Sequence, residues 1–148
     1  MLTPAQIRLY IKDVDVLNKL LDGHIQNIDE LIELAKSLTV NYANIVPPKT
    51  SYTVENFPSD TVMLYGVLHH LANGEAERNL RNNVQYQAQG LVTDIDNKYQ
   101  EYAQLAQYYK GLFDQQLGQI KQYENQEQAW GGAYSPYATT PHCWEYRD

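Results

Sequence analysis

Apolar and polar positions recur along most of this chain with the period of α-helices, and the breaks between these stretches mark the expected elements. Near the N-terminus, Thr3 can act as an N-cap residue, and Pro4 fits the first helical turn. A second short turn is expected over residues 16–21, with Asp13 or Asp15 as its cap. The apolar residues of the first helix share one face: Ile7, Tyr10 and Ile11.

The clearest helical period in the N-terminal half follows Asn27, which forms a variant of the capping box with Glu30. Pro47-Pro48 should end this helix, because proline cannot continue its backbone hydrogen bonding. Seven apolar residues have the i, i+3, i+4, i+7 spacing of a buried stripe: Ile28, Leu31, Ile32, Ala35, Leu38, Tyr42 and Ile45.

A further helix is expected with Ser59 as its N-cap. Residues 62–72 are apolar on most sides, which is typical of a central helix covered on several faces. Within it, Gly66 would allow a neighbouring element to approach closely. Gly74 is expected to bend or interrupt the helix before residues 75–82 continue it with polar character.

Residues 84–93 leave the helical period and alternate between apolar and polar positions, which predicts a short β-hairpin. Two strands alone are marginal in water, so this hairpin should pack on helices or pair with a neighbouring chain. The last helix is expected over about residues 95–128, where apolar residues recur at steps of four and three. Its length of roughly 48 Å, at 1.5 Å per residue, exceeds the diameter of such a domain, so part of it should project.

The composition changes from Ala129, where glycine, proline and aromatic residues replace the helical period. Disordered tails are usually poor in aromatic residues, which favours a docking arm over residues 129–148. The alternative is a tail folded back on its own domain. The arm residues expected to make contact are aromatic: Trp130, Tyr134, Tyr137, Trp144 and Tyr146.

These patterns together predict a mainly α fold. It should comprise a small bundle of about four helices with a short β-hairpin, a long projecting C-terminal helix and an extended C-terminal arm. Residues 1–128 would form the helical domain, and residues 129–148 would form the arm.

The charge and composition narrow the class of partner. A formal charge of −7 argues against a surface that coats nucleic acid. The 13 tyrosines, against two phenylalanines and two tryptophans, are typical of contact surfaces between subunits, although tyrosine can also replace phenylalanine in a half-buried core. No signal-peptide pattern or long apolar window occurs, so we expect cytoplasmic synthesis and no membrane segment.

The sequence contains only weak candidates for a catalytic or metal-binding site. His69-His70 are adjacent, so their side chains point about 100° apart on a helix and do not form an i, i+4 metal pair. We expect one packed and one exposed histidine. A further hypothesis for the function of the chain is an enzyme that uses His69 or His70. His142-Cys143 lacks further ligands nearby for zinc, and residues 94–97 lack the glycine and glutamate of a calcium loop. We expect no catalytic, cofactor or metal site.

Six stretches, in order, carry a family resemblance: Leu2-Thr3-Pro4 with Ile7 and Ile11, the helical pair ending at Pro47-Pro48, and residues 52–58, 62–71, 80–87 and 94–99. In this order and spacing they resemble the head–tail adaptor (connector) proteins of tailed double-stranded DNA bacteriophages. The chain departs from the family pattern at Gln89-Gly90, where a pair of glycines is expected.

The resemblance implies a structural virion protein at the neck of the particle, made in the host cytoplasm and without catalysis. Twelve copies would form a ring beneath the portal protein and receive a stopper or tail protein on the other side. Genomic DNA would pass through the channel without sequence-specific binding. Tyr86, Gln87 and Gly90 would contact a neighbouring subunit, and the long helix and C-terminal segment would reach the portal.

Two arginines, Arg78 and Arg81, lie on one helical face beside the expected hairpin. They are either part of a solvated face or form a salt bridge to a neighbouring subunit. The alternative function for the whole chain is a small cytoplasmic helical regulator or chaperone that binds a partner helix in a groove.

Overall fold

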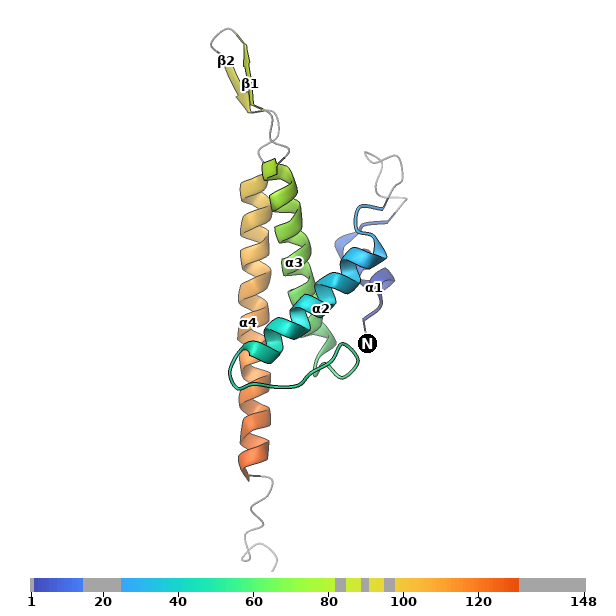
Figure 1. Ribbon diagram of the computed structural model, residues 1–148, viewed down its shortest axis with the longest axis vertical. Helices are drawn as coiled ribbons and strands as arrows, with labels where there is room; N and C mark the ends of the chain where they lie inside the picture. The colour runs from blue at the N-terminus through green and yellow to red at the C-terminus, as the bar shows by residue number, and fades with distance from the viewer. Residues whose placement is uncertain (1, 15–24, 82–84, 89–90, 95–97, 131–148) are drawn as a thin grey trace, which may run out of the picture.

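The computed structural model describes residues 2–14, 25–81, 85–88, 91–94 and 98–130, with side chains described outside the two strands and as far as residue 127. The prediction of a mainly helical fold with four helices is confirmed. The elements in chain order are α1 (Pro4–Ile11), α2 (Asp29–Ile45), α3 (Asp60–Arg81), β1 (Gln85–Ala88), β2 (Leu91–Asp94) and α4 (Tyr99–Trp130) (Figure 1).

Helix α1 starts as its sequence predicts. The Thr3 hydroxyl accepts a hydrogen bond from the Gln6 backbone N–H at 3.3 Å, and the Gln6 side chain accepts one from the Thr3 N–H at 2.9 Å. Pro4 occupies the first turn. The helix ends at Ile11, and its C-cap residue Lys12 adopts a left-handed conformation with φ of 59°. The expected turn over residues 16–21 lies outside the described residues.

The prediction that Asn27 and Glu30 form a capping box at the start of α2 is wrong. The N-cap residue is Ile28, and no side chain caps the helix. Asn27 is instead buried against the Asp13 carboxylate, which accepts hydrogen bonds from the Asn27 backbone N–H at 2.7 Å and side-chain amide at 3.0 Å. The physical reason is that Asp13, just beyond α1, offers Asn27 a buried charged acceptor, so its side chain turns away from the helix end.

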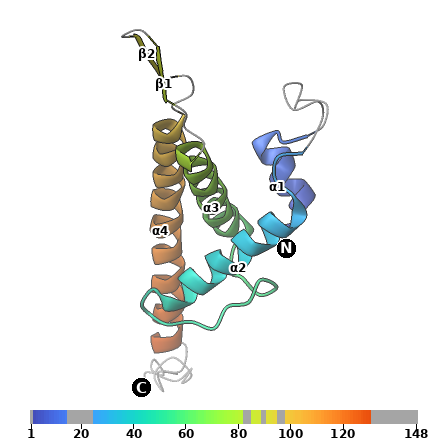
Figure 2. The ribbon, with the colours of Figure 1, turned by 45° about the horizontal axis from the view of Figure 1, so that its top comes forward.

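Helix α3 lies at the centre of the fold. It packs along α4 on one side and is crossed by α2 on another, while α1 packs beside α2 (Figure 2). It runs without a break from Asp60 to Arg81, so the predicted interruption at Gly74 is wrong. One glycine weakens a helix by only about 1 kcal/mol, and the packing of α3 against α4 on either side of Gly74 outweighs that cost.

Gly66 brings α2 close to α3, as its sequence position suggested. A methyl group at this position would lie 2.9 Å from the Thr39 hydroxyl oxygen and 3.0 Å from Cε2 of Phe113 on α4, and closer still to the Thr39 methyl group. Glycine therefore sets the distance at which all three helices meet.

The buried face of α2 differs from the predicted stripe. Of the predicted residues, only Ile32 and Ala35 are buried. The close crossing at Gly66 selects small residues, so Thr39 and Ala43 face α3 and the larger side chains turn to the flank. The predicted stripe residues that are exposed are Ile28, Leu31, Leu38, Tyr42 and Ile45.

Helix α4 spans 32 residues, and its packing follows the predicted seam in part. Ala106 and Phe113 are buried and Tyr109 stacks on Tyr65 of α3, with 6.5 Å between ring centres. Tyr123 is exposed, although it belongs to the same predicted row. Figure 1 shows α4 continuing past the first turn of α3 toward its own C-terminal end.

Strands β1 and β2 connect α3 to α4. They pair antiparallel, with Tyr86 opposite Thr93 and Gln87 opposite Val92. The residues between them and those that join them to the helices lie outside the described part of the chain.

Candidate docking site at the end of α4

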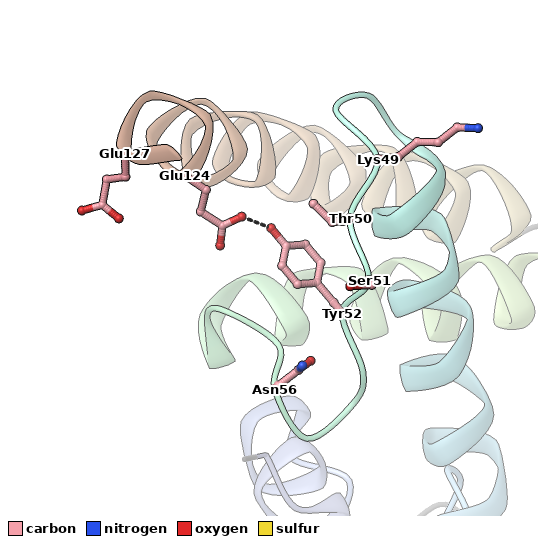
Figure 3. Close-up of a pocket in the computed structure, with 7 residues that line it drawn as sticks. All are labelled: Lys49, Thr50, Ser51, Tyr52, Asn56, Glu124 and Glu127. Carbon is pink, nitrogen blue, oxygen red and sulfur yellow. Dashed lines mark hydrogen bonds between the residues drawn. The ribbon is translucent and has the colours of Figure 1, made fainter. Parts of the chain in front are cut away.

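An open recess of about 970 Å³ lies where the loop after α2 meets the last turns of α4 (Figure 3). Its lining comes from both segments: Lys49, Thr50, Ser51, Tyr52 and Asn56 of the loop, and Glu124 and Glu127 of α4. The recess lies toward the end of α4 from which the predicted docking arm would leave. It is therefore the described surface nearest to that arm in the sequence.

The side chain of Asn44, in the last turn of α2, holds the loop in place. Its oxygen accepts hydrogen bonds from the Tyr52 backbone N–H at 2.8 Å and from the Thr50 hydroxyl at 3.1 Å. Its amide donates to the Tyr52 carbonyl at 2.9 Å. One side chain thus satisfies backbone groups that a loop would otherwise leave to water, which gives the recess a defined wall.

Lys121 fixes α4 to this loop. Its side chain is buried, and its ammonium group donates hydrogen bonds to the carbonyls of Ala43 and Val46, and to that of Pro48 at 2.9 Å. The first two carbonyls belong to the C-terminal end of α2, where a cation is favourable. Burial lowers the pKa of Lys121, and the nearby Glu124 carboxylate opposes that change.

Tyr52 joins the loop to α4 inside the recess. Its hydroxyl donates a hydrogen bond to the Glu124 carboxylate (Figure 3). Burial, and then this bond to Glu124, raise the pKa of Tyr52 to about 12. The ring also packs edge-on against Phe57, at 5.5 Å between ring centres, so the recess is tied directly to the core.

The recess is acidic on its α4 side. Glu127 is exposed, and Glu124 is half-buried beside Tyr52. The ammonium group of Lys49 points away from both carboxylates (Figure 3). Such a surface suits a partner that brings hydrogen-bond donors or a positive charge.

The predicted inter-subunit residues fall at the opposite end of the α3–α4 pair. Arg78 is half-exposed and pairs with Glu75 of the same helix at 2.6 Å, whereas Arg81 is exposed in the last turn of α3. Tyr86 and Gln87 lie on β1. Gly90 lies outside the described residues. The structure therefore groups the described members of this set around one end of the molecule.

The predicted arm residues are placed only in part. Trp130 is the last residue of α4, two residues beyond the predicted end of the helix. Tyr134, Tyr137, Trp144 and Tyr146 lie outside the described residues, as do His142 and Cys143.

The two adjacent histidines are both half-buried, so the prediction that one is exposed is wrong. Nδ1 of His69 lies 3.0 Å from the Ala106 carbonyl oxygen, which draws this ring against α4. Burial, and then the neighbouring His69, lower the pKa of His70. Within the described residues, no group of three or more histidine, cysteine, aspartate or glutamate side chains is arranged to hold a metal ion.

Sequence reasoning missed Lys121, because a lysine in a polar helix is usually solvent-exposed. A usable signal was present, since Lys121 follows Phe113 and Leu117 at steps of four and so continues the row that faces the core. Lys36 was missed in the same way. It is buried, and it pairs with the half-exposed Glu33 at 2.8 Å.

None of the helices in the described part of the chain combines the length and the apolar character needed to cross a membrane. Comparisons with protein-family models, with curated proteins and with solved structures found no match to this chain.

Proposed function

We propose that this protein is a head–tail adaptor of a tailed double-stranded DNA bacteriophage. Copies of the chain would form a ring beneath the portal, join the capsid to the tail or a stopper, and line the channel through which DNA leaves. The observation that carries the proposal is α4, which continues past the first turn of α3 (Figure 1). Such a helix offers a surface that no other element among the described residues covers.

Two further features support this function. The C-terminal half of α4 is held rigidly by Lys121 and by the bond between Tyr52 and Glu124, as a docking element requires. The chain is also acidic overall, with a formal charge of −7. An acidic channel wall would repel the phosphates of passing DNA rather than bind them.

Within this proposal the two ends of the molecule have different roles. The β1–β2 hairpin, with Tyr86 and Gln87, would contact a neighbouring subunit. The segment from Trp130 onward would dock on the portal. The ring would contain twelve copies, as the family resemblance implies.

The alternative function is a small helical regulator or chaperone that binds a partner helix. One observation favours it: α2 exposes large apolar side chains along one flank, including Leu34 and Ile45. A flank of this kind is a common docking surface for an amphipathic helix.

Removal of residues 129–148 separates the roles of domain and arm. We expect the shortened protein to keep the thermal midpoint of the full chain, because the described core lies in residues 2–127. It should lose binding to the portal protein encoded in the same genome, measured by mass photometry of the mixed complexes. Unchanged portal binding by the shortened protein would contradict the docking role of the arm.

The full-length chain tests the function itself. An adaptor should add several copies to each portal ring, whereas a regulator should stay a monomer or dimer and leave the mass of the portal unchanged. The surrounding genes give an independent test, because an adaptor gene should lie close to genes for a large terminase, a portal and a major capsid protein.

A further inference from the structure

Two adjacent histidines lie at the interface between α3 and α4. His69 and His70 are both half-buried, and their ring centres are 5.0 Å apart. Nδ1 of His69 lies 3.0 Å from the Ala106 carbonyl oxygen, so the pair is attached to α4 as well as to its own helix. Histidine is the side chain whose charge ordinarily changes near neutral pH. This interface therefore contains two groups that can gain a positive charge in mild acid.

The two helices carry no other charge along this part of their interface. Between Asp60 and Glu75, α3 has no charged side chain apart from the two histidines, and its other titratable group there is Tyr65. On the facing part of α4, no charged side chain occurs between Glu101 and Lys110. The titratable groups of α4 in that stretch are all tyrosines: Tyr102, Tyr108 and Tyr109. A charge gained by the histidines thus meets no carboxylate in either stretch.

Helix α2 brings no free carboxylate to the histidines. It meets α3 where Thr39 lies against Gly66, one turn before the histidine pair. Within one turn of Thr39, the titratable groups of α2 are Lys36 and Tyr42. Asp114 of α4 lies on the same side of the fold, but it interacts with the Tyr42 hydroxyl. The groups that α2 presents near the crossing are therefore basic or neutral at pH 7.

Helix α1 packs beside α2, and its charges are also engaged elsewhere. Its one charged side chain, Arg8, pairs with Asp29, and Tyr10 is its other titratable group. Just beyond α1, the Asp13 carboxylate accepts hydrogen bonds from the backbone and side chain of Asn27. The ion pairs in the described part of the chain involve neither histidine.

Charging both rings in the folded protein is unfavourable for two reasons. A half-buried ring loses part of the water that would solvate its charge. Two positive charges on neighbouring rings, with centres 5.0 Å apart, also repel each other, and partial burial weakens the screening of that repulsion. Consistently, burial and then the neighbouring His69 lower the pKa of His70. The unfolded chain, which leaves both rings in water, takes up the two protons more readily.

Acid acts on only one of the two places at which α4 is attached to the rest of the fold. The second place is Lys121, whose ammonium group bonds to the carbonyls of Ala43, Val46 and Pro48. These bonds need a charged lysine, so mild acid leaves them intact. Lys121 lies roughly 22 Å along α4 from Ala106, at 1.5 Å per residue.

We propose that His69 and His70 form an acid-sensitive contact, which loosens the α3–α4 interface around Ala106 in mild acid while Lys121 keeps the end of α4 in place. The direction follows from the lowered pKa of His70. Its neutral form stabilises the fold above the ordinary value of 6.5, and that stabilisation is lost as the pH falls below it. The proposal is independent of the adaptor function.

Urea unfolding at two pH values tests the contact. Between about pH 7.5 and about pH 5.5, the folding equilibrium constant of the wild type should fall at least about threefold more than that of the His69→Gln, His70→Gln double variant. Glutamine is polar and does not titrate, whereas the carboxylates and the other histidines contribute equally to both proteins. As a control, the two proteins should change in parallel above about pH 7.5, where neither ring titrates.

Hydrogen–deuterium exchange of the wild type locates the loosening. After correction for the pH dependence of intrinsic exchange, peptides from residues 64–74 and 99–110 should lose protection at about pH 5.5. Peptides from residues 115–127, which contain Lys121, should keep it. An equal loss in both regions would show that the whole fold opens together and would overturn the proposal.

Two further results would also overturn it. One is the same pH dependence of stability in the wild type and in the double variant. The other comes from an NMR titration of the wild-type imidazole resonances, which needs no variant. At least one ring should titrate below the ordinary pKa of 6.5, and four rings that all titrate at or above it would contradict the proposal. Circular dichroism at neutral pH confirms that the double variant is folded.

Discussion

The contact at Gly66 allows a sharp test of how the three main helices are held together. Replacing Gly66 with alanine adds one methyl group. That group would meet the Thr39 hydroxyl oxygen at 2.9 Å and Cε2 of Phe113 at 3.0 Å, and it would come closer still to the Thr39 methyl group. The Thr39 side chain cannot turn away freely, because its hydroxyl donates a hydrogen bond to the Ala35 carbonyl at 2.8 Å.

Two opposing terms decide the size of the effect. Alanine is favoured over glycine inside a helix by about 1 kcal/mol, which would stabilise α3. Overpacking of a close-packed core costs typically about 1–3 kcal/mol and occasionally more. Because the added methyl group meets side chains from two different helices, we expect the upper part of that range to apply. The net prediction for Gly66→Ala is a destabilisation of about 2 kcal/mol.

Gly74 provides a matched control on the same helix, because no atom lies within 4 Å of a methyl group added there. Gly74→Ala should therefore stabilise the protein by about 0.5–1 kcal/mol. Urea unfolding followed by circular dichroism gives both free energies of unfolding, provided that the slope with urea stays constant.

A double-mutant cycle with Thr39→Ser shows whether the proposed clash causes the loss. Serine removes the methyl group nearest to position 66 and keeps the hydroxyl that bonds to Ala35. Gly66→Ala should therefore cost less in the Thr39→Ser background than in the wild type. The reasoning would be refuted if Gly66→Ala proved as stable as Gly74→Ala, or if Thr39→Ser left its cost unchanged.

Three further predictions concern single side chains, and urea unfolding checks each of them. Lys121→Met should destabilise the protein by about 3 kcal/mol, because it leaves buried carbonyls without a donor, whereas Lys49→Met at the exposed position should be neutral. Tyr52→Phe should cost about 1 kcal/mol at neutral pH through the lost bond to Glu124. The folded state holds the Tyr52 proton more tightly than the unfolded state, since the pKa is raised from 10.0 to about 12. This stabilisation is therefore present below pH 10 and is lost as the pH rises to about 12, so the wild type should lose more stability in that window than Tyr52→Phe. Lys12→Gly should stabilise the protein by about 1 kcal/mol, because Lys12 is held at φ of 59°.

Local sequence signals predicted the features that depend on neighbours in the chain. The start of α1 needs only Thr3 as N-cap and Pro4 in the first turn, and the structure contains both. Glycine weakens the interior of a helix, so Gly66 within an apolar helix indicated a close approach, which the structure contains. Such features are set by backbone geometry within one element.

The orientation of α2 could not be predicted in the same way. Its period gives the spacing of apolar residues, but two adjacent arcs of the helix are both rich in them. The distance between α2 and α3, set by Gly66, decides between these arcs. It favours Thr39 and Ala43 over the bulkier Leu38 and Tyr42. That distance depends on Gly66, which lies more than twenty positions beyond Thr39 and Ala43 in the chain.

The pairs of residues that form the candidate site could not be predicted from the sequence, although the row of Phe113 and Leu117 could have indicated that Lys121 is buried. The bond between Tyr52 and Glu124 joins residues 72 positions apart, and Lys121 reaches Ala43 across 78 positions. Neither pair leaves a local pattern. The aromatic residues of the arm could be singled out by composition alone, and that remains a prediction about residues outside the described part of the chain.

The Lys121 contacts have a consequence for the order in which the chain folds. His69 on α3 meets Ala106 on α4 across 37 positions. Lys121 reaches Ala43 across 78 positions, so that contact closes a much longer loop. Because contacts near in sequence form sooner on average, the α3–α4 contact at Ala106 should form before the Lys121 contact that joins α4 to the end of α2. Folding kinetics should then give Ala106→Gly a φ-value well above that of Lys121→Met, and the reverse order would show that α2 takes part in the folding nucleus.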